Sequence, residues 1–444
     1  MTDWHARTSA IGLSPEGATL AAQNFAAVEA HFSATFGEHE TARAWWVPGR
    51  IEVLGKHTDY GGGRSLLCAV ERGFHVIARA RSDDVVRLTD ASTSSSLTLH
   101  LDATTRQRPG HWSDYPISVV RRVARDFPGT RTGMDAAVSS SLPSAAGLSS
   151  SSALVIAVFL PLAAFNDLPS HPGWSPAITS PDLLAEYIGS VENGRAFAGF
   201  AADHGVGTQG GSEDQTAILR AVPRALLQYH FVPVTPEAIV PMPSGWQFAV
   251  ATSGVHAAKG SAVQGRYNAL AGEVATLLAV WRQHTGRNDR SLFEAMATSA
   301  SAEGDLDMML AHGDYGTLRA RLRQFCEESM LIIPAVAERL LRGDVAGIGD
   351  DVARSFDLAR TVLRNQVAET EFLTRAAGQI GAAAASPFGA GFGGSVWALF
   401  SASDAPAAAR RWREAYLERF PRRRSHAGIF LSSPGPPATE LPRD

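Results

Sequence analysis

The sequence predicts an α+β protein of two domains, each with its own sheet and helices, and a cleft between them. Its 444 residues are enough for two or more cores, and 45% hydrophobic with 19% charged residues is normal for a folded chain. Apolar residues alternate or cluster as in strands over the first hundred residues, whereas long helical patterns dominate the second half. A proline-rich stretch, 232–243, separates the two parts, so we expect domains at residues 1–233 and 234–444.

Periodicity predicts the elements in order. Alternation and apolar runs predict strands over 47–54, 65–80, 85–90, 96–101, 133–142, 246–252 and 396–400. Helical patterns cover 116–127, 182–197, 212–219, 264–284, 318–341 with a break near Pro334, and 352–377. The proline-rich tail, 432–444, is predicted to be disordered.

Charge and cysteine content exclude several kinds of partner. The net charge of −4 offers no strongly basic surface for nucleic acid. Cys68 and Cys326 are far apart and belong to no metal-ligand cluster, which argues against a disulfide framework or a zinc site. No stretch approaches the roughly 18 apolar residues of a membrane span, and the N-terminus lacks a signal pattern. We therefore expect a cytoplasmic protein that binds neither nucleic acid nor membranes.

The stretch 143–154, PSAAGLSSSSAL, is suited to a polyphosphate. Gly147 lets the backbone approach an anion closely, and the serines at 149–152 supply hydroxyl and amide donors. The apolar run that follows predicts a buried helix, so its free N–H groups and positive dipole end converge on this loop. Considered alone, the serines are equally consistent with an ordinary helix cap in a flexible loop.

Two further glycine-rich segments carry polar chemistry: 48–63, PGRIEVLGKHTDYGGG, and 386–395, SPFGAGFGGS. The first is dense in ionisable side chains that are costly to bury without partners, and a sugar would supply them through its hydroxyls; the alternative is a solvated turn. It is no P-loop, because five residues separate Gly49 from Gly55 and His57 interrupts the Lys-Thr end. The second matches a dinucleotide pattern, but it is predicted to follow a helix and precede a strand, the reverse of the required context.

The segment 210–215, GGSEDQ, predicts a helix start. Ser212 as N-cap and Gln215 three residues later would form a capping box. Asp214 then lies in the first turn, where the helix dipole favours a carboxylate. Capping alone remains the simpler interpretation of this segment.

In their order and separations, the segments 48–63, 143–154 and 386–395 resemble the three motifs of the GHMP small-molecule kinases, and the first resembles the galactokinase signature. The resemblance implies an N-terminal domain like domain 2 of ribosomal protein S5, a ferredoxin-like C-terminal domain, and an active site between them. It also implies ATP-dependent phosphorylation of a monosaccharide at the anomeric hydroxyl, with Mg²⁺. A sugar and ATP would be the partners, and we expect a monomer.

The resemblance also assigns roles to individual residues. Asp214 would be the catalytic base, with Arg50 beside it and the reacting hydroxyl. The sugar would contact Lys56, His57, Asp59, Gly211 and Tyr267. ATP would be bound by Gly147, Leu148, Ser149, Ser150, Ser151, Ser152, Gly391 and Gly393. Mg²⁺ would be held by Ser151 and Glu192, with Ser150 as a near alternative.

Two departures in the first motif leave the substrate open. Galactokinases carry Asn where this chain has Glu52, and they carry Glu, which contacts the sugar's C6 hydroxyl, where it has Lys56. A lysine facing C6 would favour a hexuronate such as galacturonate. Alternatively, Lys56 pairs with Glu52 and never meets the sugar. A catalytically silent ATP and sugar sensor, and a GHMP kinase for a non-sugar alcohol, are further alternatives. The chain also has more residues between Glu192 and Asp214 than galactokinases usually have.

Overall fold

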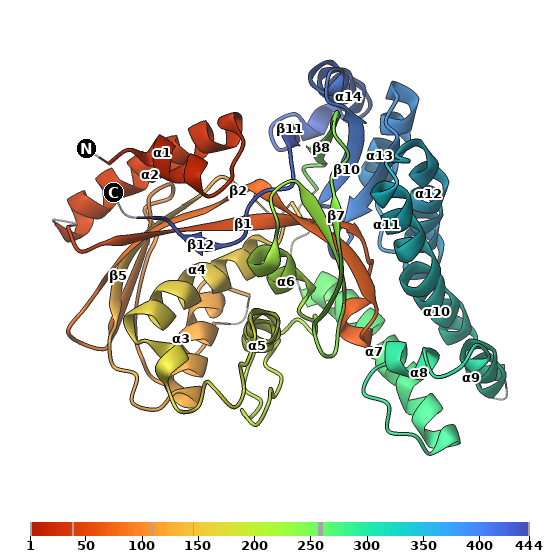
Figure 1. Ribbon diagram of the computed structural model, residues 1–444, viewed down its shortest axis with the longest axis horizontal. Helices are drawn as coiled ribbons and strands as arrows, with labels where there is room; N and C mark the ends of the chain where they lie inside the picture. The colour runs from red at the N-terminus through yellow and green to blue at the C-terminus, as the bar shows by residue number, and fades with distance from the viewer. Residues whose placement is uncertain are drawn as a thin grey trace.

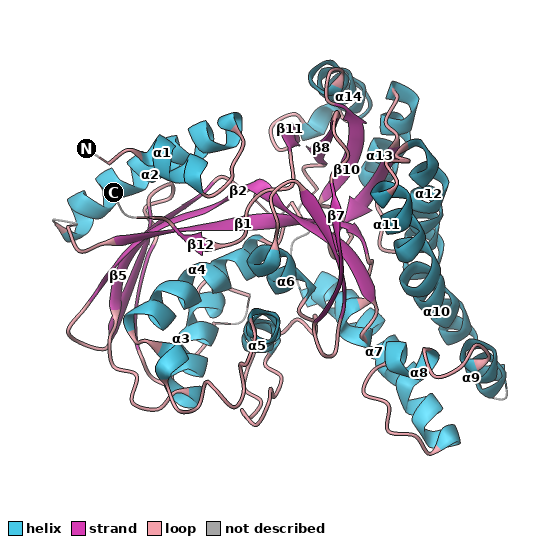
Figure 2. Ribbon diagram, in the orientation of Figure 1, coloured by secondary structure: helices cyan, strands magenta, loops and turns pink. Residues whose placement is uncertain are grey.

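The computed structural model describes residues 2–37, 40–108, 110–144, 146–255, 261–311, 313 and 315–442. Two sheets organise this part of the chain: a large sheet of eight strands and a smaller sheet of four (Figure 1). Helices lie on both faces of the large sheet and along one side of the small one (Figure 2). The α+β class predicted from the sequence is confirmed.

The large sheet has a central path in the order β12-β1-β2-β5-β3-β4, and β6 pairs with both β2 and β7. β3 and β5 run parallel, and the other pairs are antiparallel. The strands are β1 (Arg43–Leu54), β2 (Arg64–Ala80), β3 (Val85–Asp90), β4 (Ser96–His100), β5 (Met134–Ser140), β6 (Ala225–His230), β7 (Thr235–Pro241) and β12 (Thr439–Glu440). β1 and β2 pair over most of their length, and theirs is the longest strand pairing in the large sheet.

Both faces of this sheet are covered, which explains why β1 is buried along nearly its whole length. Side chains alternate between faces along a strand: Trp46 packs with Phe25 under α1 (Trp4–Ala10) and α2 (Pro15–Phe36), and Trp45 packs against Phe165 on the other face. That other face carries α3 (Asp114–Asp126), α4 (Ser150–Phe165), α5 (Pro181–Asn193) and α6 (Glu213–Arg220) (Figure 1). The helices that carry the serine loop and Asp214 therefore share one side of the sheet.

The small sheet has the order β11-β8-β10-β9 and is antiparallel throughout. It comprises β8 (Trp246–Thr252), β9 (Ala384–Phe388), β10 (Ser395–Ser401) and β11 (Gly428–Ser432), and packs on α13 (Ala368–Ile380) and α14 (Ala405–Arg419). A helical arm precedes β9 along the right of Figure 1: α7 (Ser261–Thr285), α8 (Leu292–Met296), α9 (Ala302–Ala311), α10 (Gly316–Cys326), α11 (Ile333–Leu341) and α12 (Gly349–Leu358).

Both proline-rich segments differ from their prediction. The expected boundary between residues 233 and 234 lies in the turn of the β6–β7 hairpin, so β7 still belongs to the large sheet. The tail is ordered through residue 442 rather than disordered: β12 pairs with β1, and Leu441 is buried. Proline is tolerated in edge strands, where one side of the backbone needs no partner, so proline content alone did not mark a linker. The two ends of the chain consequently lie near each other (Figure 1).

The long predicted helices are interrupted. The stretch 318–341 comprises α10, a π-helical turn η3 (Glu327–Ile332) and α11, so the irregularity precedes Pro334. The stretch 352–377 is two helices, because Arg364 adopts a left-handed conformation between η5 (Ala359–Leu363) and α13. Hydrophobic periodicity is similar for α and π turns and did not reveal either break.

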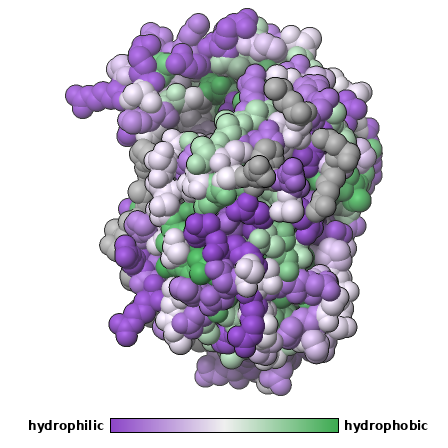
Figure 3. All heavy atoms as spheres, turned by 90° about the vertical axis from the view of Figure 1, so that its left-hand side faces the viewer, coloured by the Kyte–Doolittle hydropathy of each residue, from purple (hydrophilic) through white to green (hydrophobic). Residues whose placement is uncertain are grey.

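Two properties of the surface complete the description. The face in Figure 3 is mainly hydrophilic at its upper and lower ends, with hydrophobic side chains in small separate groups. Within the described ranges, every helix is too short or too polar to cross a membrane.

Candidate active site

One cavity of about 330 Å³ brings the three glycine- and serine-rich segments together. Its wall combines β1, the starts of α4 and α6, the N-terminal part of α7 and the loop between β9 and β10. The expected site residues that line it are Arg50, His57, Asp59, Gly147, Ser149, Ser150, Ser151, Ser152, Glu192, Gly211, Asp214, Tyr267, Gly391 and Gly393. Lys56 and Leu148 are not among the lining residues.

The serine loop has the backbone that an anion site needs. Gly147 and Ser149 both have positive φ angles, +74° and +57°, and α4 begins immediately afterwards at Ser150. Ser149 makes no side-chain capping bond, so it does not occupy the helix's N-terminal amides. A Cβ on Gly147 would lie 3.3 Å from the Phe388 carbonyl oxygen. The serine loop therefore lies in close contact with the glycine-rich segment 386–395. Leu148 contributes only its backbone, whose carbonyl accepts from the Arg50 amide at 3.2 Å, while its side chain is in the core.

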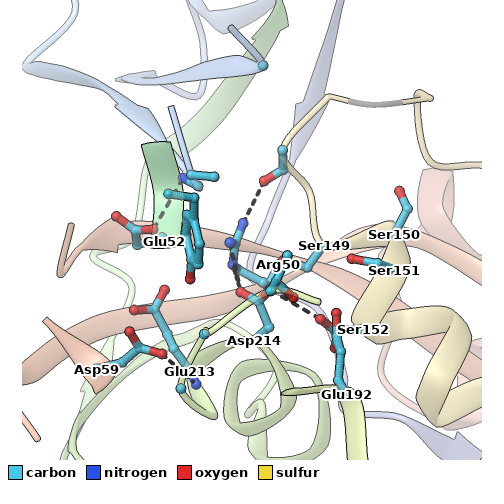
Figure 4. A pocket seen from close by; sticks show the side chains of 18 of the residues that line it. Arg50, Glu52, Asp59, Ser149, Ser150, Ser151, Ser152, Glu192, Glu213 and Asp214 are labelled. Carbon is cyan, nitrogen blue, oxygen red and sulfur yellow. Dashed lines mark hydrogen bonds and ion pairs between the residues drawn. The ribbon is translucent and has the colours of Figure 1, made fainter. Parts of the chain in front are cut away.

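Arg50 and Asp214 form the centre of the site (Figure 4). Arg50 Nε and Nη2 both donate to Asp214 Oδ1, at 2.8 and 2.7 Å, and its Nη1 donates to the Gly147 carbonyl at 2.6 Å. Asp214 Oδ2 accepts from the Ser152 hydroxyl at 3.2 Å. The carboxylate is still 30% exposed, so a substrate hydroxyl can reach it. In Figure 4 the serines and Glu192 lie on one side of this pair, and Glu52, Asp59 and Glu213 lie on the other.

Asp214 lies in the first turn of α6, but the predicted capping box is absent. Ser212 makes no side-chain bond to the helix start. Gln215, which is buried, donates instead to Glu192 Oε2 at 2.7 Å. A charge-assisted bond to a buried carboxylate is stronger than a bond to a backbone group, which explains the different partner.

At the other end of the cavity, polar groups from the loop after β1, from α6 and from α7 face one another. Asp59 Oδ2 accepts from the Glu213 amide at 3.4 Å, and a Cβ on Gly211 would lie only 2.3 Å from that oxygen, so a side chain at position 211 would displace the Asp59 carboxylate. Burial raises the pKa of Asp59. Burial also lowers the pKa of His57 to about 3, with Arg321 adding to the effect, so the imidazole is neutral. The Tyr267 ring lies 5.2 Å from the His57 ring.

Two more carboxyl groups line this end, and sequence analysis did not assign them to the site. Glu52 Oε2 accepts from the Gly389 amide at 3.2 Å, and burial raises the pKa of Glu52 to about 7. Glu213 Oε2 accepts from the Ser65 hydroxyl at 2.8 Å. Burial, helped by the Glu52 and Asp59 carboxyls, holds the pKa of Glu213 well above its usual range. Two features of the sequence could have indicated these carboxyl groups. Glu52 stands where galactokinases carry Asn, and Glu213 directly precedes Asp214.

Lys56 points away from the cavity and contacts the helical arm. Its ammonium donates to the Ser355 hydroxyl at 2.9 Å, and the residue is 2% exposed. The Ser355 hydroxyl donates in turn to Glu328 Oε1 at 2.9 Å, and the same oxygen accepts from the Gly55 amide at 3.0 Å. The Lys56 ammonium therefore lies outside the cavity, and its hydrogen-bond partner is Ser355 rather than Glu52.

Residues of α10 and η3 hold the whole 55–64 loop. Arg321 donates to the His57 carbonyl at 2.6 Å, and Gln324 donates to the Lys56 carbonyl at 3.3 Å. The π turn η3 places two consecutive residues against the loop. Glu328 Oε1 accepts from the Gly55 amide, and the Ser329 hydroxyl oxygen accepts from the Arg64 amide at 2.8 Å. These partners are separated by more than 260 positions along the chain. No local pattern could have revealed them.

The donor set beside the serine loop fits Mg²⁺. Ser151 and Glu192 both line the same side of the cavity as the loop (Figure 4), and they supply a hydroxyl and a carboxylate oxygen. Mg²⁺ prefers such hard oxygens and commonly takes only one or two protein ligands beside phosphates and waters. Among the described residues there is no group of three or more His, Cys, Asp or Glu side chains arranged for a metal.

The residues that precede Asp214 extend the cavity wall. Gln264 donates to the Val206 carbonyl at 3.3 Å and Asn268 donates to the Gly207 carbonyl at 3.0 Å, so the loop before Asp214 is attached to α7. Thr208 from this loop lines the cavity. Residues 256–260, which precede α7, lie outside the described residues.

The glycine-rich loop 389–394 joins β9 to β10. It follows a strand, not the helix predicted from sequence, and no helix begins after it. The conclusion that it is no dinucleotide fingerprint still holds, because that motif requires a helix N-terminus at the phosphates.

Comparison with known proteins agrees with this arrangement. Three family models match: a galactokinase galactose-binding signature at residues 30–80, a GHMP kinase N-terminal domain at 114–196, and a GHMP kinase C-terminal domain at 332–418. Galactokinases of Actinobacillus pleuropneumoniae and Chloroflexus aggregans are 26% and 28% identical, over 82% and 84% of this chain and 87% and 88% of theirs. The fold matches Lactococcus lactis galactokinase complexed with galactose, with a TM-score of 0.78 and 22% identity over 94% of this chain and 99% of that one.

The two-domain fold and the cavity built from three motifs define a small-molecule kinase of the GHMP type. Within that superfamily the chain is similar to the galactokinases, whose galactose-binding signature it carries.

Proposed function

We propose that the protein transfers the γ-phosphoryl group of ATP to the anomeric hydroxyl of galactose, giving galactose 1-phosphate and ADP. The curated relatives named above are galactokinases, and one matched family model describes galactose binding. The observation that carries the proposal is the position of Asp214. Its carboxylate contacts Arg50 and Ser152 at the point where the serine loop meets the acidic end of the cavity.

The chemistry follows from this position. The sugar's anomeric oxygen attacks the γ-phosphorus, the bond from that phosphorus to the oxygen bridging to ADP breaks, and the hydroxyl proton passes to Asp214. Because phosphoryl transfer has a loose transition state, the base mainly orients the hydroxyl and accepts its proton late. Arg50 keeps the carboxylate oriented toward the substrate. The amides at the start of α4 stabilise the phosphate charge.

We assign Mg²⁺ to Ser151 and Glu192. The ion would offset the charge on the ATP phosphates when bound. Gln215 donates to one oxygen of Glu192 and so fixes the direction of the carboxylate.

The cavity has little to attract the carboxylate of a hexuronate, which favours a neutral sugar. Glu52, Asp59 and Glu213 line its acidic end, and among the described lining residues only Arg50, which is paired with Asp214, carries a positive charge while His57 stays neutral. Lys56, the group that would have attracted a carboxylate, is bonded elsewhere. The Arg50–Asp214 pair is assembled for catalysis, which also speaks against a silent sensor.

We further propose that the enzyme is cytoplasmic and monomeric. Cys68 and Cys326 are free and buried thiols, as expected in a reducing compartment. A single chain supplies each catalytic and binding group named above.

An ADP-release assay with Mg-ATP and a panel of free sugars, including galactose, glucose and galacturonate, tests the function. We expect galactose to be the best substrate and its product to carry phosphorus coupled to H1 in the NMR spectrum. ADP release that requires no sugar, or phosphate on another carbon, would overturn the proposal.

A further inference from the structure

The Tyr60 hydroxyl lies between a buried arginine and the imidazole of the sugar motif. Arg321 Nη2, on α10, is 3.1 Å from the Tyr60 oxygen, and that oxygen is 3.1 Å from His57 Nδ1. On the other side of the ring, His57 Nε2 is 3.2 Å from the Ala390 carbonyl oxygen. Arg321 is 1% exposed, so its guanidinium group, where this chain of hydrogen bonds begins, is shielded from water.

The donors and acceptors in this chain can be arranged in one way. A guanidinium group has only donors, so the Tyr60 oxygen accepts from Arg321. Tyr60 has a single hydroxyl proton, and it is directed to His57 Nδ1, the remaining partner. Nδ1 is then the acceptor nitrogen, and the ring proton resides on Nε2, where the Ala390 carbonyl can accept it. The opposite tautomer would set the Nε2 lone pair against a carbonyl oxygen.

The electrostatic surroundings are consistent with this arrangement. Burial raises the pKa of Tyr60, so the phenol keeps the proton that it donates. Burial lowers the pKa of His57 to about 3, so the ring carries one proton rather than two.

We propose that Arg321 is a positioning residue that acts through Tyr60 to present His57 to the sugar as a fixed Nε2–H donor. When the sugar binds, one of its hydroxyl oxygens replaces the Ala390 carbonyl as the acceptor. Ala390 belongs to the glycine-rich loop and lines the cavity, so this exchange takes place inside the site. The inference rests on the proposed function, because it describes how the same site recognises its sugar.

Arg321 also donates to the His57 carbonyl, which gives it a structural role as well. Tyr60→Phe separates the two roles, because it removes the relay and leaves the Arg321 bond to the His57 backbone in place. We expect Tyr60→Phe to raise the KM for galactose about tenfold, the value of one hydrogen bond. The KM for ATP and kcat should stay near the wild-type values. Tyr229→Phe is the matched control: it removes another tyrosine hydroxyl bond, to Asp182, outside the cavity, and should leave the KM unchanged.

A double-mutant cycle isolates the relay. If Arg321 orients the imidazole through Tyr60, Tyr60→Phe adds nothing to the KM of an Arg321→Met variant. Additive effects would mean that Arg321 acts only through the backbone, and would overturn the proposal.

Nitrogen-15 NMR of the histidine side chains gives a readout that does not depend on activity. The His57 resonance, assigned by its loss in His57→Gln, should show a protonated Nε2 and an unprotonated Nδ1, with no titration between pH 5 and 9. A protonated Nδ1 or a titrating ring would overturn the proposal. Failure of the proposed function would instead appear as wild-type protein that releases no ADP with any sugar, whatever the tautomer of His57.

Discussion

At the phosphate end of the cavity, the loop 146–152 is marked by local features, positive φ angles at Gly147 and Ser149 and a helix that starts at Ser150, although Arg50 also bonds the Gly147 and Leu148 carbonyls. At the sugar end, the loop 55–64 is held by buried side chains of α10, η3 and α12 that are remote in sequence. The first end depends on which residues follow one another, and the second depends on which helices pack against it. Variants at the two ends should therefore fail in different ways.

The largest effect is expected where the two ends meet. Asp214→Asn keeps the shape of the side chain but cannot accept the substrate proton, so kcat should fall by about 10²–10⁴-fold. The melting temperature should change little, because the amide oxygen still accepts from Arg50 and the amide NH2 can donate to the Ser152 hydroxyl oxygen. ADP release and thermal unfolding measure the two quantities. Asp182→Asn, at a carboxylate paired with Arg220 outside the cavity, is the control and should retain activity. Near-normal turnover by a folded Asp214→Asn protein would reject Asp214 as the base.

At the sugar end, Glu328→Ala should lower the free energy of unfolding by about 3–5 kcal/mol, because the buried Ser355 hydroxyl and the Gly55 amide both lose a charged hydrogen-bond acceptor. Urea unfolding measures this change. Glu327→Ala, one position earlier, removes only a partly exposed ion pair with Arg354 and should lower it by at most about 1 kcal/mol. Equal losses in the two variants would show that the buried network does not stabilise the loop.

At the phosphate end, Gly147→Val should weaken binding of a non-hydrolysable ATP analogue about tenfold, or about 1.4 kcal/mol. A branched side chain disfavours the positive φ and meets the Phe388 carbonyl. Gly129→Val tests backbone strain alone, since Gly129 also has a positive φ but faces open space. Calorimetric titration distinguishes them, and equal affinities for the analogue would place the phosphates elsewhere.

The smallest expected effect is on specificity. Lys56→Met should destabilise the fold, yet the ratio of kcat/KM for galactose to that for galacturonate should not change, because the ammonium bonds Ser355 and not a ligand. Parallel assays with both sugars measure the ratio. A fall in kcat/KM for galacturonate alone would show that Lys56 contacts the sugar.

Much of the fold and of the site could be predicted because the relevant signals are local. Alternation predicted strands within a few residues of β3, β5 and β8, and short motifs led to Arg50, Asp214 and the serine loop, which the structure brings into one cavity. The proline-rich segments were misread because amino-acid composition does not show which strands a segment pairs with. Pro241 ends the edge strand β7, and the tail supplies β12, which pairs with β1.

What the sequence by itself determined about this protein is the α+β class, the kinase motifs and most of the residues that line the cavity around Arg50 and Asp214, since glycine conformations, helix starts and hydroxyl clusters are properties of adjacent residues. Tertiary structure alone decided the direction of Lys56, the carboxyl groups around the sugar end and the partners of His57. Those depend on burial and on hydrogen bonds between segments far apart in the chain. The sequence alone does not show whether the Lys56 ammonium contacts a ligand or another side chain. The packing of α12 against the loop directs it to Ser355.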